Sequence, residues 1–192
     1  TAGTSLATDG PKIEVKGGSV ALASVGANSE VTVDKGTVTY DGKGYALYSK
    51  NNGKVNLTDG KLVLKGEATG FSVDASVPAS AQPIKLTGSK VDMQSDNAIL
   101  MSIKNAANLS TTGIAATLLG YSGLNPSDVS TSTGNNYYKL AVLDGAKINI
   151  DGAGIDKSDS TAGSDSEVFT RRLIIQNSIL NVDSKVLAQL NL

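Results

Sequence analysis

The residues best suited to recognise a ligand lie in one polar stretch, GYSGLNPSDVSTSTGNNYYK, at residues 120–139. Tyrosine offers a flat apolar ring that ends in a hydroxyl, and nearby asparagine amides add adaptable hydrogen bonds. This mixture suits a protein or a sugar, because sugars stack on aromatic rings while amides bind their hydroxyls. The candidate binding residues are Tyr121, Asn125, Asn136, Tyr137 and Tyr138. A structural alternative is that Tyr137 and Tyr138 begin a strand, with one ring facing inward and the other outward.

Arg171 and Arg172, the only arginines of the chain, are further candidate binding residues. A guanidinium can bind a carboxylate through two parallel hydrogen bonds, and arginine is enriched at interface hot spots. On a strand the two side chains would point to opposite faces. The alternative is a salt bridge at a corner of the fold, to Asp165 or Glu167.

Acidic residues near these arginines could be read as a calcium loop: Asp156, Asp159, Asp165 and Glu167. Their spacing matches neither the EF-hand loop nor the nonapeptide repeat of calcium-binding β-helices. We therefore predict solvated loop carboxylates, no metal site and no cofactor.

Aspartates could also act as acid and base on a polysaccharide, in the pairs Asp34 with Asp59, or Asp151 with Asp92. Glycoside hydrolysis needs two carboxyl groups about 5 to 10 Å apart across a cleft. However, aspartate beside Gly or Lys-Gly is also what a tight turn requires. The chain has no His and no Cys, which excludes a His-dependent triad, a zinc site and a thiol nucleophile within it. We predict that the chain is not an enzyme, with a polysaccharide-cleaving β-helix enzyme as an alternative.

Charge and hydropathy bear on two other classes of partner. The net charge is -1, from 17 basic and 18 acidic side chains, with no basic stripe of the kind that nucleic acid requires. No apolar run approaches the roughly 20 residues that span a bilayer, and the start, TAGTSLATDG, lacks the features of a signal peptide. We expect no nucleic-acid partner, and a chain that is a mature piece or a fragment of something longer.

A strand motif recurs along the chain and must position these residues. It reads VTVDKGTV at 31–38, VNLTDGKL at 55–62, IKLTGSKV at 84–91 and INIDGAGI at 148–155, with weaker copies ANLSTTGI at 107–114 and ILNVDSKV at 179–186. Apolar residues alternate within each copy, which predicts strands with one buried face. Each unit is too short to close a core alone, so neighbouring units must stack.

Three architectures use units of this kind. A propeller blade needs roughly 40 or more residues, whereas the first two spacings here are 24 and 29 residues. A β-sandwich, with turn signals every 8 to 12 residues or so, fits nearly as well as a parallel β-helix. Intact motifs at a drifting spacing favour the β-helix, which accepts variable loops at fixed corners. We predict one all-β, right-handed parallel β-helix (solenoid) over residues 1–192, with about six to eight coils from residue 12 onward, stacked about 4.8 Å apart.

Loops and corners of this solenoid can also be placed. Long loop insertions are predicted at about 118–138 and 154–167, where polar, turn-rich sequence interrupts the motif. Gly36 and Gly60 fall between paired strands, where a turn needs a residue that tolerates positive φ. A corner ladder of side-chain amides is expected from Asn51, Asn52 and Asn56, with Asn28 one coil earlier.

Long stretches of the chain resemble a known family: GYALYSKNNGKVNLTDGKLVLKGEATG, IKLTGSKVDMQSDNAILMSIKNAANLSTTGI and YYKLAVLDGAKINIDGAGIDKSDSTAGSDSEVFTRRLIIQNSILNV. They resemble the passengers of large autotransporter adhesins, and above all the very large type V outer-membrane adhesins of fusobacteria. The resemblance spans roughly residues 17–185. It implies a right-handed parallel β-helix displayed outside the outer membrane by a C-terminal β-barrel, which we expect to lie outside this chain. That family has no shared catalytic or binding signature that could be carried over to individual residues.

The resemblance implies a virulence-associated adhesin, delivered by type V secretion to the extracellular face of the outer membrane. Its partner would be a host or bacterial cell-surface protein or glycan, bound through loops such as 118–138, with membrane contact only through the barrel. The alternative is a purely structural stalk that holds a distal binding tip away from the membrane. Exposed tyrosines in the insertion would favour the adhesin, whereas buried rings under a uniformly polar outer face would favour the stalk.

Overall fold

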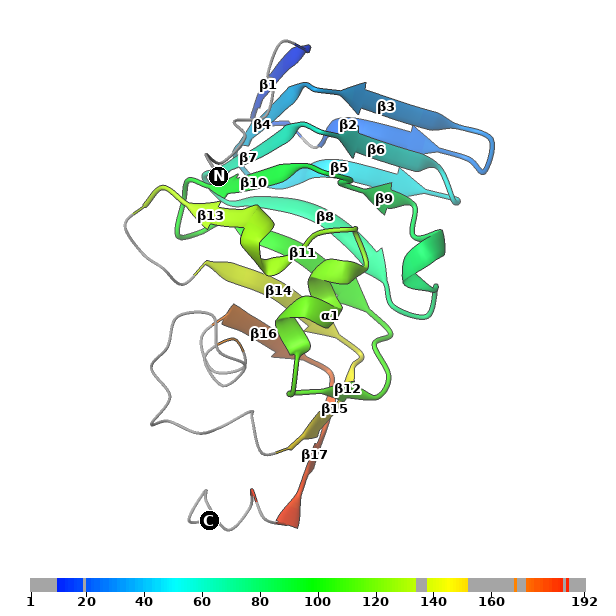
Figure 1. Cartoon of the computed structure of the whole chain (residues 1–192), viewed down its shortest axis with the longest axis vertical. Coiled ribbons are helices and arrows are strands. Elements are labelled where there is room, and N and C mark those ends of the chain that lie inside the picture. The colour runs from blue at the N-terminus through cyan, green and yellow to red at the C-terminus, as the bar shows by residue number, and fades with distance from the viewer. Residues whose placement is uncertain are drawn as a thin grey trace, which may run out of the picture.

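The repeated motif folds into a right-handed parallel β-helix, whose strands stack coil on coil as the chain descends from its N-terminus (Figure 1). This computed structural model describes residues 10–18, 20–133, 138–151, 168, 172–184 and 186. The all-β parallel β-helix expected from the repeats is confirmed.

Two long sheets form two sides of the described solenoid; sheet 1 has a strand in each of the first five coils, and sheet 2 has one in all six. Sheet 1 contains β1 (Lys12–Lys16), β4 (Thr37–Asp41), β7 (Lys61–Lys65), β10 (Lys90–Met93) and β13 (Val129–Thr131). Sheet 2 contains β2 (Val20–Val25), β5 (Gly44–Lys50), β8 (Ala68–Asp74), β11 (Ile99–Lys104), β14 (Lys139–Asp144) and β16 (Leu173–Gln176). The strands of sheet 2 therefore mark six coils in the described part of the chain.

The third side of the solenoid is divided. Sheet 3 contains β3 (Glu30–Asp34), β6 (Lys54–Thr58) and β9 (Ile84–Lys85), and sheet 4 contains β12 (Leu109–Ser110), β15 (Lys147–Ile150) and β17 (Ile179–Val182). A short 3-10 helix, η1 (Ala79–Ala81), precedes β9. Between sheets 3 and 4 lie α1 (Ile114–Gly120) and a second 3-10 helix, η2 (Pro126–Asp128) (Figure 1).

The strand registers test the sequence alignment directly. Val31 pairs with Val55, and Val55 pairs with Ile84, as the repeat predicts. The weak copy at Ile179 is aligned wrongly by one residue, because Ile148 pairs with Leu180. A shift of one residue exchanges the two faces of a strand. All four residues of β17 are exposed, so burial does not fix its register as it does in earlier coils.

Columns of apolar side chains fill the interior. In sheet 1, Val38 stacks on Leu62 and Tyr40 stacks on Leu64, and all four have no exposed surface. Full burial of such a side chain is worth about 1.5 to 3 kcal/mol. The Tyr40 hydroxyl donates to the carbonyls of Gly18 (2.9 Å) or Lys43 (3.0 Å), so its polar end is satisfied. The inward face of these strands is the one that their alternation predicts.

Sheet 2 breaks the simple alternation in the middle of its strands. In β5 both Ala46 and Leu47 are fully buried, and in β11 both Leu100 and Met101 are fully buried. The residues on either side of each buried pair, such as Tyr45 and Tyr48, are half-buried. Two consecutive inward residues reset the period, so residues three apart face outward together.

The corners carry their strained residues one position earlier than the sequence predicts. Positive φ occurs at Lys35 (55°) and Asp59 (49°), and not at the glycines that follow them. Gly36 and Gly60 are needed for a different reason: a Cβ on Gly60 would lie 2.5 Å from the carbonyl oxygen of Gly36 in the coil before. These glycines therefore permit close contact between coils.

The predicted asparagine ladder is wrong in its members. Asn51 and Asn52 have positive φ in an exposed turn, while Asn56 donates to Glu30 at 2.8 Å and to Thr32 at 3.3 Å. A stacked amide pair does occur in sheet 4, where Asn181 donates to Asn149 at 3.3 Å. Register decides this outcome, because Asn56 lies beside Thr32 in the ladder and no asparagine occupies the matching position.

Candidate functional site

The predicted insertion is present, with different bounds and more regular structure than a loop. It comprises residues 111–128, between β12 and β13, and is called the insertion below. Residues 129–131, which fall in the range predicted as loop, form β13 and pair with β10. The second predicted insertion, at 154–167, lies outside the described residues.

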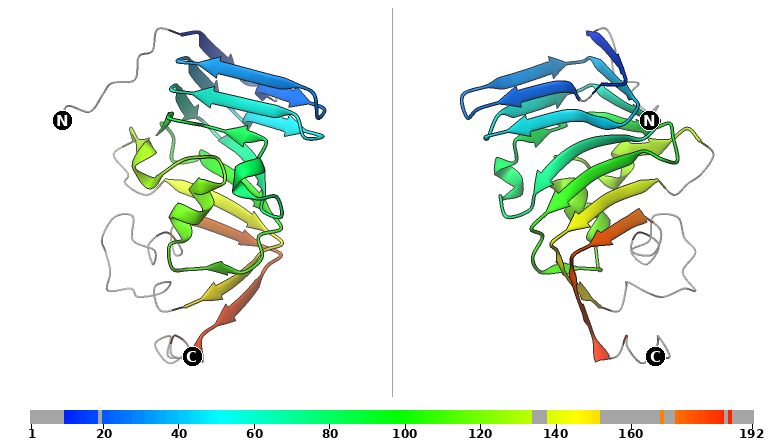
Figure 2. Two further views of the ribbon diagram at one scale, coloured as in Figure 1. Left: turned by 45° about the vertical axis from the view of Figure 1, so that its right-hand side comes forward. Right: turned by 180° about the vertical axis from the view of Figure 1, so that it is seen from behind.

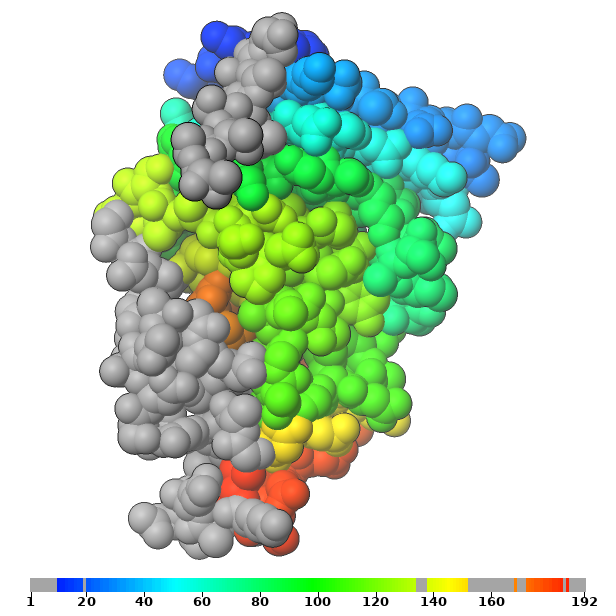
Figure 3. All heavy atoms as spheres, in the orientation of Figure 1, coloured from blue at the N-terminus to red at the C-terminus, as the bar shows by residue number. Residues whose placement is uncertain are grey.

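The insertion packs its apolar side onto the solenoid. Ile114, Leu118 and Leu119 of α1 have no exposed surface, and their spacing follows the helical period. The N–H of Leu86 donates to the carbonyl of Ser122 at 2.8 Å, so the insertion takes the place of a strand beneath the end of β9. In the space-filling view the insertion occupies the middle of the front face (Figure 3). Its opposite side exposes polar and small residues: Ala116, Thr117, Gly120, Gly123, Asn125, Pro126 and Ser127.

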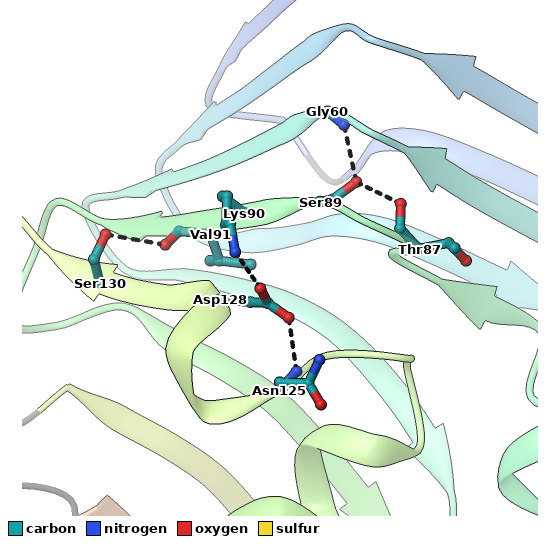
Figure 4. Close-up of polar contacts among 8 residues, drawn as sticks. All are labelled: Gly60, Thr87, Ser89, Lys90, Val91, Asn125, Asp128 and Ser130. Atoms are coloured by element: carbon teal, nitrogen blue, oxygen red, sulfur yellow. Dashed lines mark hydrogen bonds and ion pairs between the residues drawn. The ribbon is translucent and has the colours of Figure 1, made fainter. Parts of the chain in front are cut away.

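Polar contacts hold the far end of the insertion on β10 (Figure 4). Lys90 forms an ion pair with Asp128, and the other carboxylate oxygen of Asp128 accepts the N–H of Asn125 at 2.8 Å. Burial raises the pKa of Asp128, but Lys90 and the Asn125 N–H outweigh that effect and hold the pKa below its usual value. Lys85 reaches the carbonyl of Tyr121 at 3.4 Å from β9, and burial lowers its pKa.

A buried serine secures the strands under this contact. Ser89 has no exposed surface; its hydroxyl accepts the N–H of Gly60 at 3.0 Å and donates to the carbonyl of Leu57 at 2.8 Å (Figure 4). It replaces backbone hydrogen bonds at the corner that leads into β10. The strands on which the insertion packs are therefore held together by side-chain as well as backbone hydrogen bonds.

The structure separates the predicted binding residues into three groups. Tyr121 and Asn125 lie on the insertion; the Tyr121 ring packs partly against the core, and Asn125 is exposed. Tyr138 and Arg172 lie against each other and are buried. The remaining three, Asn136, Tyr137 and Arg171, lie outside the described residues, as do the calcium-loop and salt-bridge candidates Asp156, Asp159, Asp165 and Glu167.

Tyr138 and Arg172 are not available to a surface ligand, which corrects their prediction as binding residues. The Arg172 guanidinium lies 3.8 Å from the centroid of the Tyr138 ring, and the two residues are 6% and 9% exposed, respectively. They immediately precede β16 and β14, two paired strands, so strand pairing draws them together. Burial raises the pKa of the Tyr138 hydroxyl, and the adjacent arginine partly offsets this rise.

Two tyrosines that sequence reasoning passed over are more exposed than Tyr138. Tyr45 and Tyr48, in GYALYSK, are half-buried and lie outside the hydrophobic core. A strict period of two would place their rings on opposite faces, so the sequence gives no reason to pair them. The available signal was the run Ala46–Leu47, which is apolar where alternation demands a polar residue.

Two of the carboxylates considered for catalysis, Asp151 and Asp92, accept hydrogen bonds from side chains of neighbouring residues. Asp151 accepts hydrogen bonds from the hydroxyls of Ser110, Thr111 (2.6 Å) and Thr112 (2.8 Å), and from the N–H of Thr112 (3.2 Å). Burial raises its pKa, but these donors lower it to about 2. Asp92 accepts from Ser132 at 2.6 Å and from Gln94 at 2.7 Å.

The predicted carboxylate pairs do not stack. Asp92 lies in sheet 1, whereas Asp151 follows a strand of sheet 4. Asp34 pairs in register with Thr58, one residue before Asp59. Within the described residues, no group of three or more acidic residues is placed to hold a metal ion. No helix there is long and apolar enough to cross a membrane.

Comparison with protein-family models, curated proteins and solved structures finds no match for this chain.

Proposed function

We propose that this chain is a β-helical segment of a bacterial cell-surface adhesin, and that the insertion contacts a protein or glycan on another cell. The extracellular face of the outer membrane is the location that goes with this role, as the resemblance of the sequence suggests. The resemblance supplies the biological setting, and the insertion supplies the contact surface.

The observation that carries this proposal is the construction of the insertion. One side is anchored by fully buried leucines and by the Lys90–Asp128 ion pair, while the other exposes Asn125, Ser127 and backbone at two glycines. A surface held in one conformation loses little entropy when it binds, and exposed amides and hydroxyls suit polar ligands. Binding and recognition residues commonly lie on such connections between scaffold strands.

Binding to whole target cells and to a glycan array tests the proposal. The variant Asn125→Ala/Ser127→Ala removes exposed polar groups without touching the core, and Asn28→Ala, in an exposed turn of the first coil, is the matched control. We expect saturable binding by the wild type, a loss of about tenfold or more in affinity in the double variant, and no change in the control. Binding that is equal in all three proteins would refute the insertion as the contact surface.

A structural stalk is the second candidate, and burial of the tyrosines favours it. Tyr121, the one tyrosine of the insertion, packs partly against the core, and Tyr138, which precedes β14, is covered by Arg172, so neither ring is fully presented to a ligand. A well-folded wild type that binds no cell and no glycan would support this role.

The observed carboxylates argue against the third candidate, a polysaccharide-cleaving enzyme. A general acid for glycoside cleavage needs a raised pKa. The pKa of Asp151 is instead lowered to about 2 by its hydroxyl donors.

A further inference from the structure

Tyr45 and Tyr48 form an aromatic pair on β5 of sheet 2. This sheet lies on the side of the solenoid opposite α1 (Figure 2). The rings of Tyr45 and Tyr48 have centroids 6.2 Å apart and planes inclined by 48°. Aromatic pairs favour such tilted contacts at about 4.5 to 7 Å, so each ring helps to hold the other in place. In the described part of the chain neither hydroxyl has a hydrogen-bond partner, in contrast to the satisfied hydroxyl of Tyr40 in the core.

The outward position of both rings follows from the observed strand geometry, and not from a regular alternation of inward and outward residues. Ala46 and Leu47 between the rings are both fully buried, which turns both tyrosines toward solvent. A tyrosine that served packing alone would point inward, as Tyr40 does. This pair costs exposed apolar surface without adding to the core, which is typical of a recognition surface.

The positions beside the pair are uncharged: hydroxyl-bearing residues occur on β8 and β11, with Ile99 beside Thr69, and Val20 pairs with Tyr45 on the β2 side. On the next strand Thr69 pairs with Tyr45, and Ser72 follows it at the same spacing of three residues. Ser72 pairs in turn with Ser102. On the other side of β5, Tyr48 pairs with the exposed Ala23. The two rings therefore project beyond smaller, uncharged side chains, among which Thr69, Ser72 and Ser102 carry hydroxyl groups.

We propose that Tyr45 and Tyr48, with Thr69, Ser72 and Ser102, form a binding subsite for a neutral oligosaccharide. A pyranose ring has an apolar face of C–H groups that stacks on an aromatic ring, and a rim of hydroxyls that pair with Ser, Thr and Tyr hydroxyls. The subsite is separate from the insertion and does not depend on the function proposed for it.

Charge and size favour a neutral sugar over other ligands. Charged residues at the ends of these strands alternate in sign: Lys50 ends β5, Asp74 ends β8 and pairs with Lys104, and Lys104 pairs with Asp144. Such an arrangement attracts neither anions nor cations over a distance. Two half-buried tyrosines expose only part of their rings, on the order of 100 Å² together, which suits one or two sugar rings. A stable protein interface needs about 800 Å² from each partner.

The test is titration of the purified 192-residue chain with cellotriose, maltotriose, chitotriose and N-acetyllactosamine, followed by saturation-transfer NMR and calorimetry. Tyr45→Ala/Tyr48→Ala removes both stacking faces, Tyr45→Phe/Tyr48→Phe keeps them, and Asn28→Ala, in an exposed turn, is the control; Asn125→Ala tests the insertion separately. The single alanine variants are measured as well, and circular dichroism checks that each variant is folded.

We expect at least one of these sugars to bind the wild type, with affinity reduced about tenfold or more in the double alanine variant. The double phenylalanine variant should keep most of the affinity, and Asn28→Ala should match the wild type. The proposal is overturned if none of the sugars binds, or if the double alanine variant binds as well as the wild type. It is also overturned if the tyrosine pair is required for attachment to cells stripped of glycans, because the partner is then a protein. Loss of sugar binding in Asn125→Ala alone would instead place the sugar on the insertion.

Discussion

Gly60→Ala should destabilise the β-helix by about 2 to 4 kcal/mol, because two coils make close contact at this glycine. A Cβ there would lie 2.5 Å from the Gly36 carbonyl oxygen and 2.8 Å from Cδ1 of the buried Leu57. The Gly36 carbonyl cannot move freely, since it accepts the N–H of Lys61 at 2.9 Å. Relief of the overlap costs about 1 to 3 kcal/mol in displaced packing. The weakened hydrogen bond adds about 1 kcal/mol.

Thermal unfolding followed by circular dichroism measures this effect. At roughly 2 to 4 °C per kcal/mol for a chain of this length, Tm should fall by roughly 4 to 16 °C. Gly120→Ala is the matched control: it lies in α1 with no heavy atom within 4 Å of the added Cβ, and alanine favours helix. We expect it to melt at or slightly above the wild type. If Gly60→Ala melts as the control does, close contact between coils is not the reason for the glycine.

Three further predictions concern the polar groups. Ser89→Ala should lower the free energy of unfolding by about 1 to 3 kcal/mol in a urea titration, because it leaves the Gly60 N–H without its partner; unchanged hydrogen exchange at that amide would contradict this. Arg172→Gln should raise the pKa of the Tyr138 hydroxyl further, since the cation 3.8 Å from the ring is lost. Alkaline absorbance titration, read as the difference from Tyr138→Phe, checks it, and an unchanged pKa would count against the contact. Asp151 has a folded-state pKa of about 2, below its usual 3.8, so its stabilisation is complete above pH 3.8 and is lost as the pH falls toward 2. Allowing for solvent screening, Asp151→Asn should lower the free energy of unfolding by about 1 kcal/mol at pH 7 and by progressively less below pH 4. Urea titrations at several pH values measure this loss, and a loss that does not change with pH would contradict the role of the ionised carboxylate.

The exposure of the candidate site residues could not be predicted from the sequence. Tyr138 and Arg172 were singled out as exposed recognition residues, yet pairing of the strands that follow them buries them together. A regular period of two would place Tyr45 and Tyr48 on opposite faces, yet a doubled inward position turns both outward. In each case the residue types were informative about chemistry, while their exposure depended on neighbours from other coils.

By itself the sequence determined the kind of fold and the register of the early coils, as the pairing of Val31, Val55 and Ile84 shows. These features are local: alternating apolar residues define a buried face, and the spacing of the repeats defines a coil. Only the tertiary structure decided which glycines separate coils, where the insertion is anchored, and which tyrosines meet solvent. Those outcomes depend on atoms that stacking brings within a few ångströms of one another, although they lie a whole coil apart along the chain, and no local pattern records that contact.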